Sequence, residues 1–167
     1  MKNICLTGLM GSGKSTVGAA LAQKLGLEFV DIDAKIEFKT GMKISEIFAQ
    51  KGEDFFRKIE SETLKEFAEK SGQVISTGGG AVQKEGNLKI LKENSTVIYL
   101  KTSPEVLFER VNADTSRPLL QNEKPFETLC ALLEKREPNY QKADIIVTTD
   151  GKTVDEIVNE ILKNAES

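Results

Sequence analysis

Residues 8–15 read Gly8-Leu9-Met10-Gly11-Ser12-Gly13-Lys14-Ser15 and match the phosphate-binding loop pattern G-x-x-x-x-G-K-[ST]. The apolar run Ile4-Cys5-Leu6 comes just before the motif and is typical of a buried strand. A helical pattern of apolar residues follows, with Val17 and Leu21 on one face. A strand, a glycine turn and a helix in this order place backbone N–H groups around phosphate oxygens. The motif therefore predicts that the chain binds a nucleoside triphosphate.

Two side chains of the motif carry specific chemistry. The Lys14 ammonium group would contact the β- and γ-phosphates, and the Ser15 hydroxyl would be a ligand of Mg²⁺. The glycines let the backbone approach phosphate oxygens without clashes from Cβ atoms. We therefore expect a magnesium nucleotide at this loop.

Composition narrows the class of protein. The chain has 167 residues, enough for one domain with a full core, and a net charge of −3, which does not favour nucleic acid or an anionic membrane as a partner. It contains no histidine, which excludes imidazole bases and histidine-ligated metals. Two cysteines are too few for a disulfide framework, and Cys5 is expected in the core. Without a visible targeting or membrane-spanning segment, we expect a cytoplasmic enzyme.

Short apolar runs alternate with amphipathic segments along the whole chain. Continuous apolar runs of this kind predict an α/β fold, with a doubly wound parallel sheet covered by helices on both faces. The expected strands span residues 3–7, 28–31, 73–76, 96–100 and 144–148. Helices are expected over residues 53–69 and 125–141 and along the C-terminal segment from Val154 to Leu162.

Two segments interrupt this alternation. Residues 33–70 are too long for one crossover and are expected to hold several helices, and residues 111–124 are polar without a clear period. Such insertions in phosphate-loop proteins commonly host the second substrate and a closing lid. Residues 111–124 could be a plain surface loop, but Arg117 favours a lid, because phosphoryl transfer needs cations that arrive on closure.

Two aspartates close the second expected strand. Asp31 and Asp33 alternate there, so strand geometry would point both side chains at the ligand crevice beyond the sheet. Asp31 is placed to hold Mg²⁺ through water, and Asp33 to accept a hydrogen bond from an acceptor hydroxyl. The alternative is that one of them caps the next helix, which is a common role of aspartate.

A glycine run and two arginines complete the candidate site. Gly78, Gly79 and Gly80 follow the third expected strand, where three glycines make sense if the backbone must approach a ligand closely. The guanidinium groups of Arg57 and Arg136 are suited to bidentate binding of a carboxylate. For Arg57, a solvated helix pair with Glu53 or Glu60, worth about 0.2–0.5 kcal/mol, is equally open from spacing alone.

Taken together, these motifs resemble shikimate kinases over nearly the whole chain. The shared features are Gly8 to Ser15, Asp31-x-Asp33, Phe56-Arg57-x-x-Glu60, Gly78-Gly79-Gly80, Arg117-Pro118-Leu119-Leu120, and Arg136-x-Pro138-x-Tyr140 followed by Ala143-Asp144. Many nucleotide enzymes share the first feature, whereas the other five in this order are specific to this family. The resemblance implies a phosphate-loop kinase of the nucleoside monophosphate kinase type, with a five-stranded parallel sheet in a single domain over residues 1–167.

The resemblance also implies a role for each matching position. Residues 33–60 would form the substrate-binding region and residues 111–124 the lid. The nucleotide would be bound by Gly11, Ser12, Gly13, Lys14, Ser15, Thr16, Arg110 near the adenine, and Arg117. Shikimate would be bound by Asp33, Arg57, Gly79, Gly80 and Arg136, with Lys14, Asp33 and Arg117 as catalytic residues and Ser15 and Asp31 at the Mg²⁺. Some family members carry an arginine in the loop after the last strand, where Lys152 stands here.

The implied reaction transfers the γ-phosphoryl group of ATP to the 3-hydroxyl of shikimate, in a monomeric enzyme. Asp33 would orient that hydroxyl, and whether it also takes the proton is open. One rival is a kinase of the same fold with another acceptor, such as gluconate or a nucleoside monophosphate. A second rival is a nucleotide-dependent switch, although the chain lacks the Asn-Lys-x-Asp motif of a GTPase.

Overall fold

Five parallel strands pair into one sheet in the computed structural model, which describes residues 2–112 and 123–166. The strands are β1 (Asn3–Thr7), β2 (Glu28–Asp31), β3 (Gln73–Ser76), β4 (Ser95–Lys101) and β5 (Ile145–Thr148). Their order is β2-β3-β1-β4-β5, so β1 is central and the chain reverses direction across the sheet on either side of it. The register pairs Leu6 of β1 with Ser76 of β3 and with Ile98 of β4.

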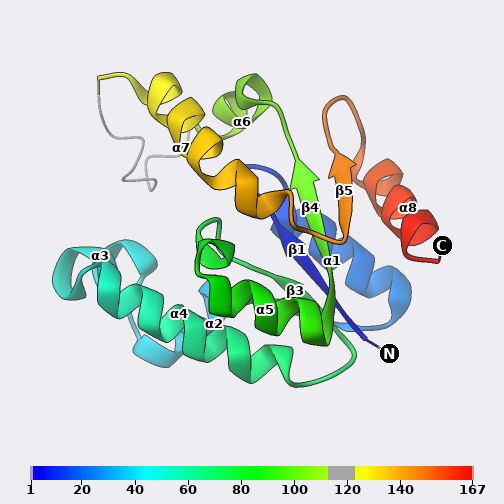
Figure 1. The fold of residues 1–167 in the computed structure, drawn as a ribbon, viewed down its shortest axis with the longest axis horizontal. Coiled ribbons are helices and arrows are strands. Elements are labelled where there is room, and N and C mark those ends of the chain that lie inside the picture. Colours follow the sequence, from blue (N-terminus) through cyan, green and yellow to red (C-terminus); the bar gives the residue numbers. More distant parts are fainter. Residues whose placement is uncertain (1, 113–122, 167) are drawn as a thin grey trace.

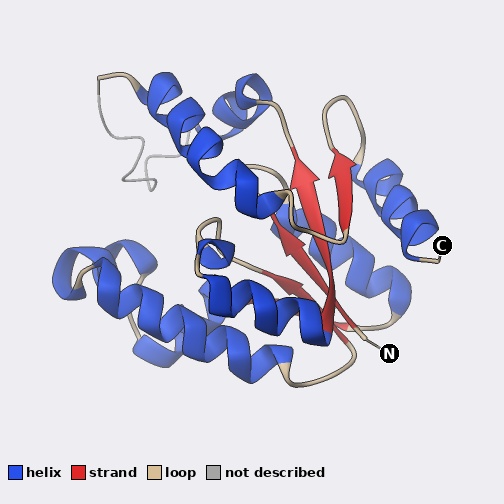
Figure 2. Ribbon diagram, in the orientation of Figure 1, coloured by secondary structure: helices blue, strands red, loops and turns tan. Residues whose placement is uncertain are grey.

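Helices cover both faces of the sheet (Figures 1 and 2). The helices α1 (Lys14–Leu25) and α8 (Val154–Ala165) pack together on one face. The other face is covered by α4 (Glu53–Ala68), α5 (Glu85–Asn94) and α7 (Pro125–Tyr140). The remaining helices extend from these layers, and they are α2 (Ile32–Thr40), α3 (Ile44–Lys51), the 3₁₀ turn η1 (Ala81–Gln83) and α6 (Pro104–Val111).

Alternation along the central strands divides the core into two apolar clusters. Leu6 and Ile98 face α1 and α8, whereas Cys5 and Val97 face the helices on the opposite side. This follows from strand geometry, because successive side chains point to opposite faces of the sheet. Burial raises the pKa of the Cys5 thiol, so Cys5 is an inert core residue, as predicted.

Local sequence sets where several helices begin and end. The chain leaves α1 at Gly26, whose φ of 67° is in the left-handed region that terminates helices. The helix α6 begins after Ser103, whose hydroxyl accepts a hydrogen bond from the Val106 N–H. A reciprocal capping box between Thr153 and Glu156 starts α8. These signals are local, since each involves residues within one turn of the helix end.

Two loops and the start of α2 meet where β1, β2 and β3 end. The phosphate-loop motif follows β1, α2 with Asp33 follows β2 directly, and the glycine run follows β3. The Thr77 N–H and hydroxyl both donate to the Leu6 carbonyl oxygen, at 3.2 and 3.1 Å, and so tie the start of the loop after β3 to β1. This is the carboxyl edge of the sheet at its switch point, where open α/β sheets bind ligands.

The sequence predictions for the fold are confirmed. All five strands form within a residue of their expected bounds and pair in parallel, and residues 33–70 contain three helices, α2, α3 and α4. Most of the expected lid, including Arg117, lies outside the described residues. In the described part of the chain, no helix has the length and apolar character needed to cross a bilayer.

We predict that Asn3→Ala lowers the free energy of unfolding by about 2–4 kcal/mol, measured by urea denaturation. The Asn3 side chain is 1% exposed, donates to the Ala68 and Lys70 carbonyl oxygens at 3.1 and 2.6 Å, and accepts from the Gln73 N–H at 3.0 Å. Its loss leaves the α4–β3 connection without these partners. Asn164→Ala, at an exposed position of α8, is the matched control. An equal loss of stability in both variants would contradict this role of Asn3.

Candidate functional site

The phosphate-loop residues form a tight turn between β1 and α1. Gly8, Gly11 and Gly13 have φ angles of 146°, 82° and 93°, which favour glycine strongly. A Cβ atom at Gly8 would lie 2.8 Å from the Leu100 carbonyl oxygen, so no other residue fits there. The Lys14 ammonium group donates to the Gly8 and Leu9 carbonyl oxygens at 2.7 and 3.1 Å. The lysine charge is thus held across the loop, where a phosphate would bind.

The remaining nucleotide residues surround this loop. Ser12 is buried inside the turn, and Thr16 is exposed on the first turn of α1. Arg110 reaches the loop from α6 and donates to the Gly11 carbonyl oxygen at 2.8 Å. The structure therefore brings Arg110 to the phosphate loop, as a nucleotide-binding role requires. Lys152, which stands where some family members carry an arginine, forms an ion pair with Glu160 of α8 at 2.6 Å.

Ser15 and Asp31 form the candidate metal site. The Ser15 hydroxyl lies 3.1 Å from Asp31 Oδ2, while Asp31 Oδ1 accepts from the Ala34 N–H and caps α2. The helix-capping alternative is therefore correct for Asp31, and the same carboxylate still reaches Ser15. A hydroxyl and a carboxylate oxygen suit Mg²⁺, which keeps several water ligands and takes few from protein. No group of three or more His, Cys, Asp or Glu side chains that could hold a metal ion occurs among residues 2–112 and 123–166.

The prediction that Asp33 shares a strand face with Asp31 is wrong. β2 ends at Asp31, and Asp33 lies in the first turn of α2. Helical rather than extended geometry directs its carboxylate toward the glycine run, where a Cβ atom on Gly78 would lie 3.0 Å from Asp33 Oδ1. Asp33 still lies at the carboxyl edge of the sheet, so its candidate role is unchanged.

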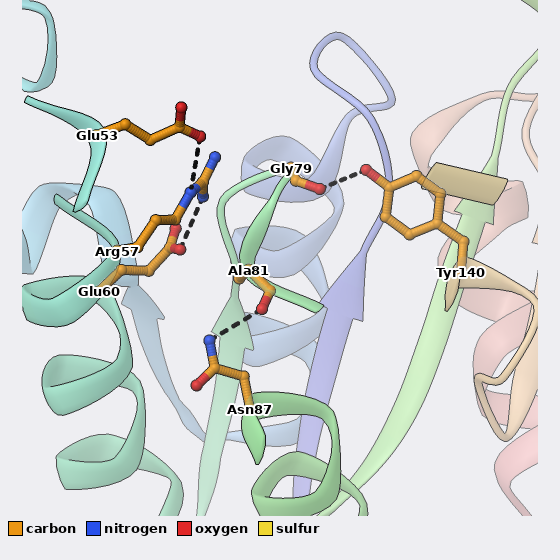
Figure 3. A network of polar contacts seen from close by, with 7 residues as sticks. All are labelled: Glu53, Arg57, Glu60, Gly79, Ala81, Asn87 and Tyr140. Carbon is orange, nitrogen blue, oxygen red and sulfur yellow. Dashed lines mark hydrogen bonds and ion pairs between the residues drawn. The ribbon is translucent and has the colours of Figure 1, made fainter. Parts of the chain in front are cut away.

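Arg57 is half-buried and pairs with the buried carboxylate of Glu60. Its Nη1 lies 2.8 Å from Glu60 Oε1, and its Nε lies 3.5 Å from Glu53 Oε1 (Figure 3). Glu53 is exposed, whereas the Glu60 side chain is 1% exposed, so the idea of a solvated helix pair fails for Glu60. Burial raises the pKa of the Glu60 carboxyl, and the nearby Arg57 guanidinium only partly opposes that shift.

Arg136 is buried beside the same loop from the opposite side. The residue is 8% exposed, and it enters none of the ion pairs in the part of the chain that the structure describes. It lies beside the Tyr140 hydroxyl and, together with Arg57, lowers the pKa of Glu60. Burying a guanidinium without a carboxylate partner is costly. Such a group is typical of a site that binds an anion.

The three glycines explain how these charges come together. A Cβ atom on Gly78 would lie 3.0 Å from Glu60 Oε2, one on Gly79 would lie 3.1 Å from Arg136 Nη1, and one on Gly80 would lie 2.6 Å from Arg57 Nη2. Each glycine therefore leaves space for one charged side chain. A Cβ atom on Gly79 would also lie 3.6 Å from the Gly8 carbonyl oxygen, so the run adjoins the phosphate loop.

Glu60 is a site residue whose burial sequence reasoning missed. The sequence places Glu60 in the motif Phe56-Arg57-x-x-Glu60 and as a possible solvated partner of Arg57, and neither interpretation predicts that its side chain is buried. Yet positions 56, 60, 63 and 67 follow the apolar stripe of α4, and a carboxylate on such a stripe is a signal that could have revealed it. Glu60 Oε2 is buried and has no hydrogen-bond partner within the described parts of the chain. This oxygen can accept a hydrogen bond from a ligand or from water.

Comparisons with known proteins agree with this geometry. A family model described as shikimate kinase matches residues 10–166. A shikimate kinase of Thermodesulfovibrio yellowstonii is 49% identical over 99% of this chain and 96% of its own. The solved structure "Shikimate kinase from Acinetobacter baumannii in complex with shikimate" is 40% identical, with a TM-score of 0.96 over 99% of this chain and 93% of that chain. A gluconokinase from Sinorhizobium meliloti, 24% identical with a TM-score of 0.67 over 99% of this chain and 91% of that chain, is similar in fold alone.

We predict that, as pH rises, the stability of the Glu60→Gln variant increases relative to that of the unchanged protein. Because burial raises the pKa of Glu60, its favourable contribution is complete below the ordinary carboxyl pKa of 4.5 and is lost as pH rises through the folded-state pKa. Glutamine removes this titration. Thermal unfolding from pH 4 to 7 measures the difference between the two proteins. The exposed Glu62→Gln is the control, and a difference that does not change with pH for Glu60→Gln would refute the assignment.

Proposed function

The chain belongs to the shikimate kinase family, and on that premise we propose how its residues divide the work of the reaction. The enzyme phosphorylates shikimate with ATP, a step of aromatic amino acid biosynthesis. The assignment of roles rests on the environment of Arg136. This guanidinium is buried beside a glycine run and takes part in none of the ion pairs of the described residues. A small carboxylic acid supplies the charge that this position lacks.

Arg136 and Arg57 bind the shikimate carboxylate from the two sides of the glycine run. Gly79 and Gly80 give the acid room to approach, because each has a guanidinium where a side chain would otherwise stand. Asp33 hydrogen-bonds the ring hydroxyls from the start of α2. Supporting this arrangement, both arginines act electrostatically on the same buried Glu60. Residues 33–60 are the substrate-binding region of a single domain that spans residues 1–167.

The phosphate loop binds ATP through residues Gly11 to Thr16, and Arg110 lies near the adenine. The positive φ angles of Gly11 and Gly13 support the loop assignment, as does the Lys14 charge held across the loop. Lys14 neutralises the β- and γ-phosphates. Arg117, from the lid of residues 111–124, adds a second cation to the phosphates on closure, and this role stays a prediction from the sequence.

Ser15 and Asp31 hold Mg²⁺, Ser15 through its hydroxyl and Asp31 through water. The Ser15 hydroxyl donates a hydrogen bond to Asp31 Oδ2 at 3.1 Å, which keeps the two oxygens that would face the ion together. When bound, the ion neutralises charge on the phosphate oxygens. With so few protein ligands, its binding depends on the nucleotide.

The chemical step needs positioning and charge neutralisation more than covalent catalysis. Asp33 orients the 3-hydroxyl of shikimate toward the γ-phosphorus, and the proton leaves late in a loose transition state. Lys14 and Arg117 spread the charge of the transferred group. Since the glycine run adjoins the phosphate loop, the acceptor lies next to the phosphates.

The same proposal covers the enzyme's surroundings. We place it in the cytoplasm as a monomer that takes shikimate and ATP and binds neither nucleic acid nor membrane. A net charge of −3 supports this, because it repels polyanionic surfaces.

Phosphorus NMR of the protein with ATP, Mg²⁺ and shikimate tests the function, and we expect the 3-phosphate of shikimate to form. Arg136→Ala should lower kcat/KM for shikimate, because a charge-assisted pair is lost. The fall should correspond to a loss of about 2–4 kcal/mol of transition-state binding. Gluconate and a nucleoside monophosphate serve as alternative acceptors. Faster turnover of either one, or near-normal shikimate affinity in Arg136→Ala, would reject the assignment.

Gly80→Ala tests the steric role of the glycine run. The new Cβ atom would lie 2.6 Å from Arg57 Nη2 and force the guanidinium away, so the KM for shikimate should rise about tenfold or more. Gly86→Ala is the matched control, because the space around a Cβ atom there is open. Steady-state kinetics with each substrate varied measures both, and equal KM values for the two variants would argue against this role.

A further inference from the structure

The turn of α7 that carries Arg136 is weakly held by its own helix. Pro138 lies inside α7, two residues after Arg136. Proline has no N–H to donate to the carbonyl oxygen four residues earlier, and its ring crowds that carbonyl group. A helix end of this kind bends easily. Contacts from outside α7 therefore add to the hydrogen bonds that hold this turn and the guanidinium that it carries.

Side-chain hydrogen bonds connect this turn to the segment that follows the glycine run. Asn139 Nδ2 donates to Gln83 Oε1 at 2.8 Å, and Gln83 Nε2 donates to the Arg136 carbonyl oxygen at 3.4 Å. The Tyr140 hydroxyl donates to the Gly79 carbonyl oxygen, and Figure 3 shows these two groups facing each other. Contacts on both sides of Pro138 thus reach residues 79 and 83.

The hydroxyl of Tyr140 is held in place as a hydrogen-bond donor. Its ring is buried and stacked on Tyr99, with the ring centroids 4.9 Å apart. Burial raises the pKa of Tyr140 to about 12, so the hydroxyl keeps its proton near neutral pH. Beyond the glycine run, Asn87 Nδ2 donates to the Ala81 carbonyl oxygen at 2.9 Å. The loop is therefore held by α7 on one side and by α5 on the other (Figure 3).

We propose that Gln83, Asn139 and Tyr140 form a clamp that aligns Arg136 with the glycine run and thereby sets the selectivity for a carboxylate. This inference rests on the proposed role of Arg136. The three are positioning residues, because they act through Arg136. A Cβ atom at Gly79 would lie 3.1 Å from Arg136 Nη1, so the guanidinium already packs closely on the loop. A bidentate contact tolerates little misplacement, so a small shift of α7 weakens it.

The clamp can be tested by comparing shikimate with its carboxamide, which lacks the negative charge. In Gln83→Met, Asn139→Ala and Tyr140→Phe, we expect the preference for the acid over the amide, measured as a ratio of dissociation constants, to fall about three- to tenfold. The KM for ATP should stay within about twofold, because the nucleotide does not depend on Arg136. The double variant of Gln83 and Asn139 should lose no more than the larger single effect, because the two share one bond.

Asn94→Ala is the matched control, since the Asn94 side chain makes a comparable hydrogen bond to the Ile90 carbonyl oxygen within α5, away from the clamp. A clamp variant that folds and keeps the full preference for the acid would overturn the proposal. Equal losses for acid, amide and ATP would also overturn it, because they would indicate a general loosening of the fold. If Arg136→Ala itself keeps the preference, the proposed role of Arg136 fails, and the clamp fails with it.

Discussion

The absence of side chains at Gly78, Gly79 and Gly80 permits ionised groups from three helices to share one edge of the sheet. Asp33, Glu60, Arg57 and Arg136 all lie within van der Waals or hydrogen-bond range of Cβ positions that the chain leaves empty or of one another. Their formal charges cancel, which lowers the cost of burying them. Glu60 also keeps one carboxylate oxygen that has no hydrogen-bond partner among the described residues. The cluster therefore presents guanidinium groups and a hydrogen-bond acceptor at one edge of the sheet.

The order of the strands then decides what this ligand meets. β1 lies between β3 and β4, so the phosphate loop after β1 and the glycine run after β3 are neighbours. Both loops present mainly backbone groups at this edge of the sheet, and in the proposed function one would face phosphate oxygens and the other an organic acid. Because rigid strands carry both loops, the two reactants approach each other without a long-range rearrangement of the core.

Most of the architecture could be predicted because its signals are local. The apolar runs specify five strands, and the phosphate-loop motif specifies its own turn. The face of Asp33 was predicted wrongly because Asp31 is both the last residue of β2 and the N-cap of α2, and periodicity does not fix such a boundary. The burial of Glu60 could have been predicted from its position on the apolar stripe of α4. The bond from Asn139 to Gln83 spans 56 residues, so only the folded chain reveals it.

The bare backbone of the glycine run also bears on how the enzyme could escape an inhibitor. A compound that rests against Gly79 and Gly80 touches atoms common to every amino acid, so a resistant variant would have to add a side chain there. Any addition would enter the space of Arg136 or Arg57. Substitutions at these two positions that confer resistance would therefore also weaken the binding of the enzyme's own substrate.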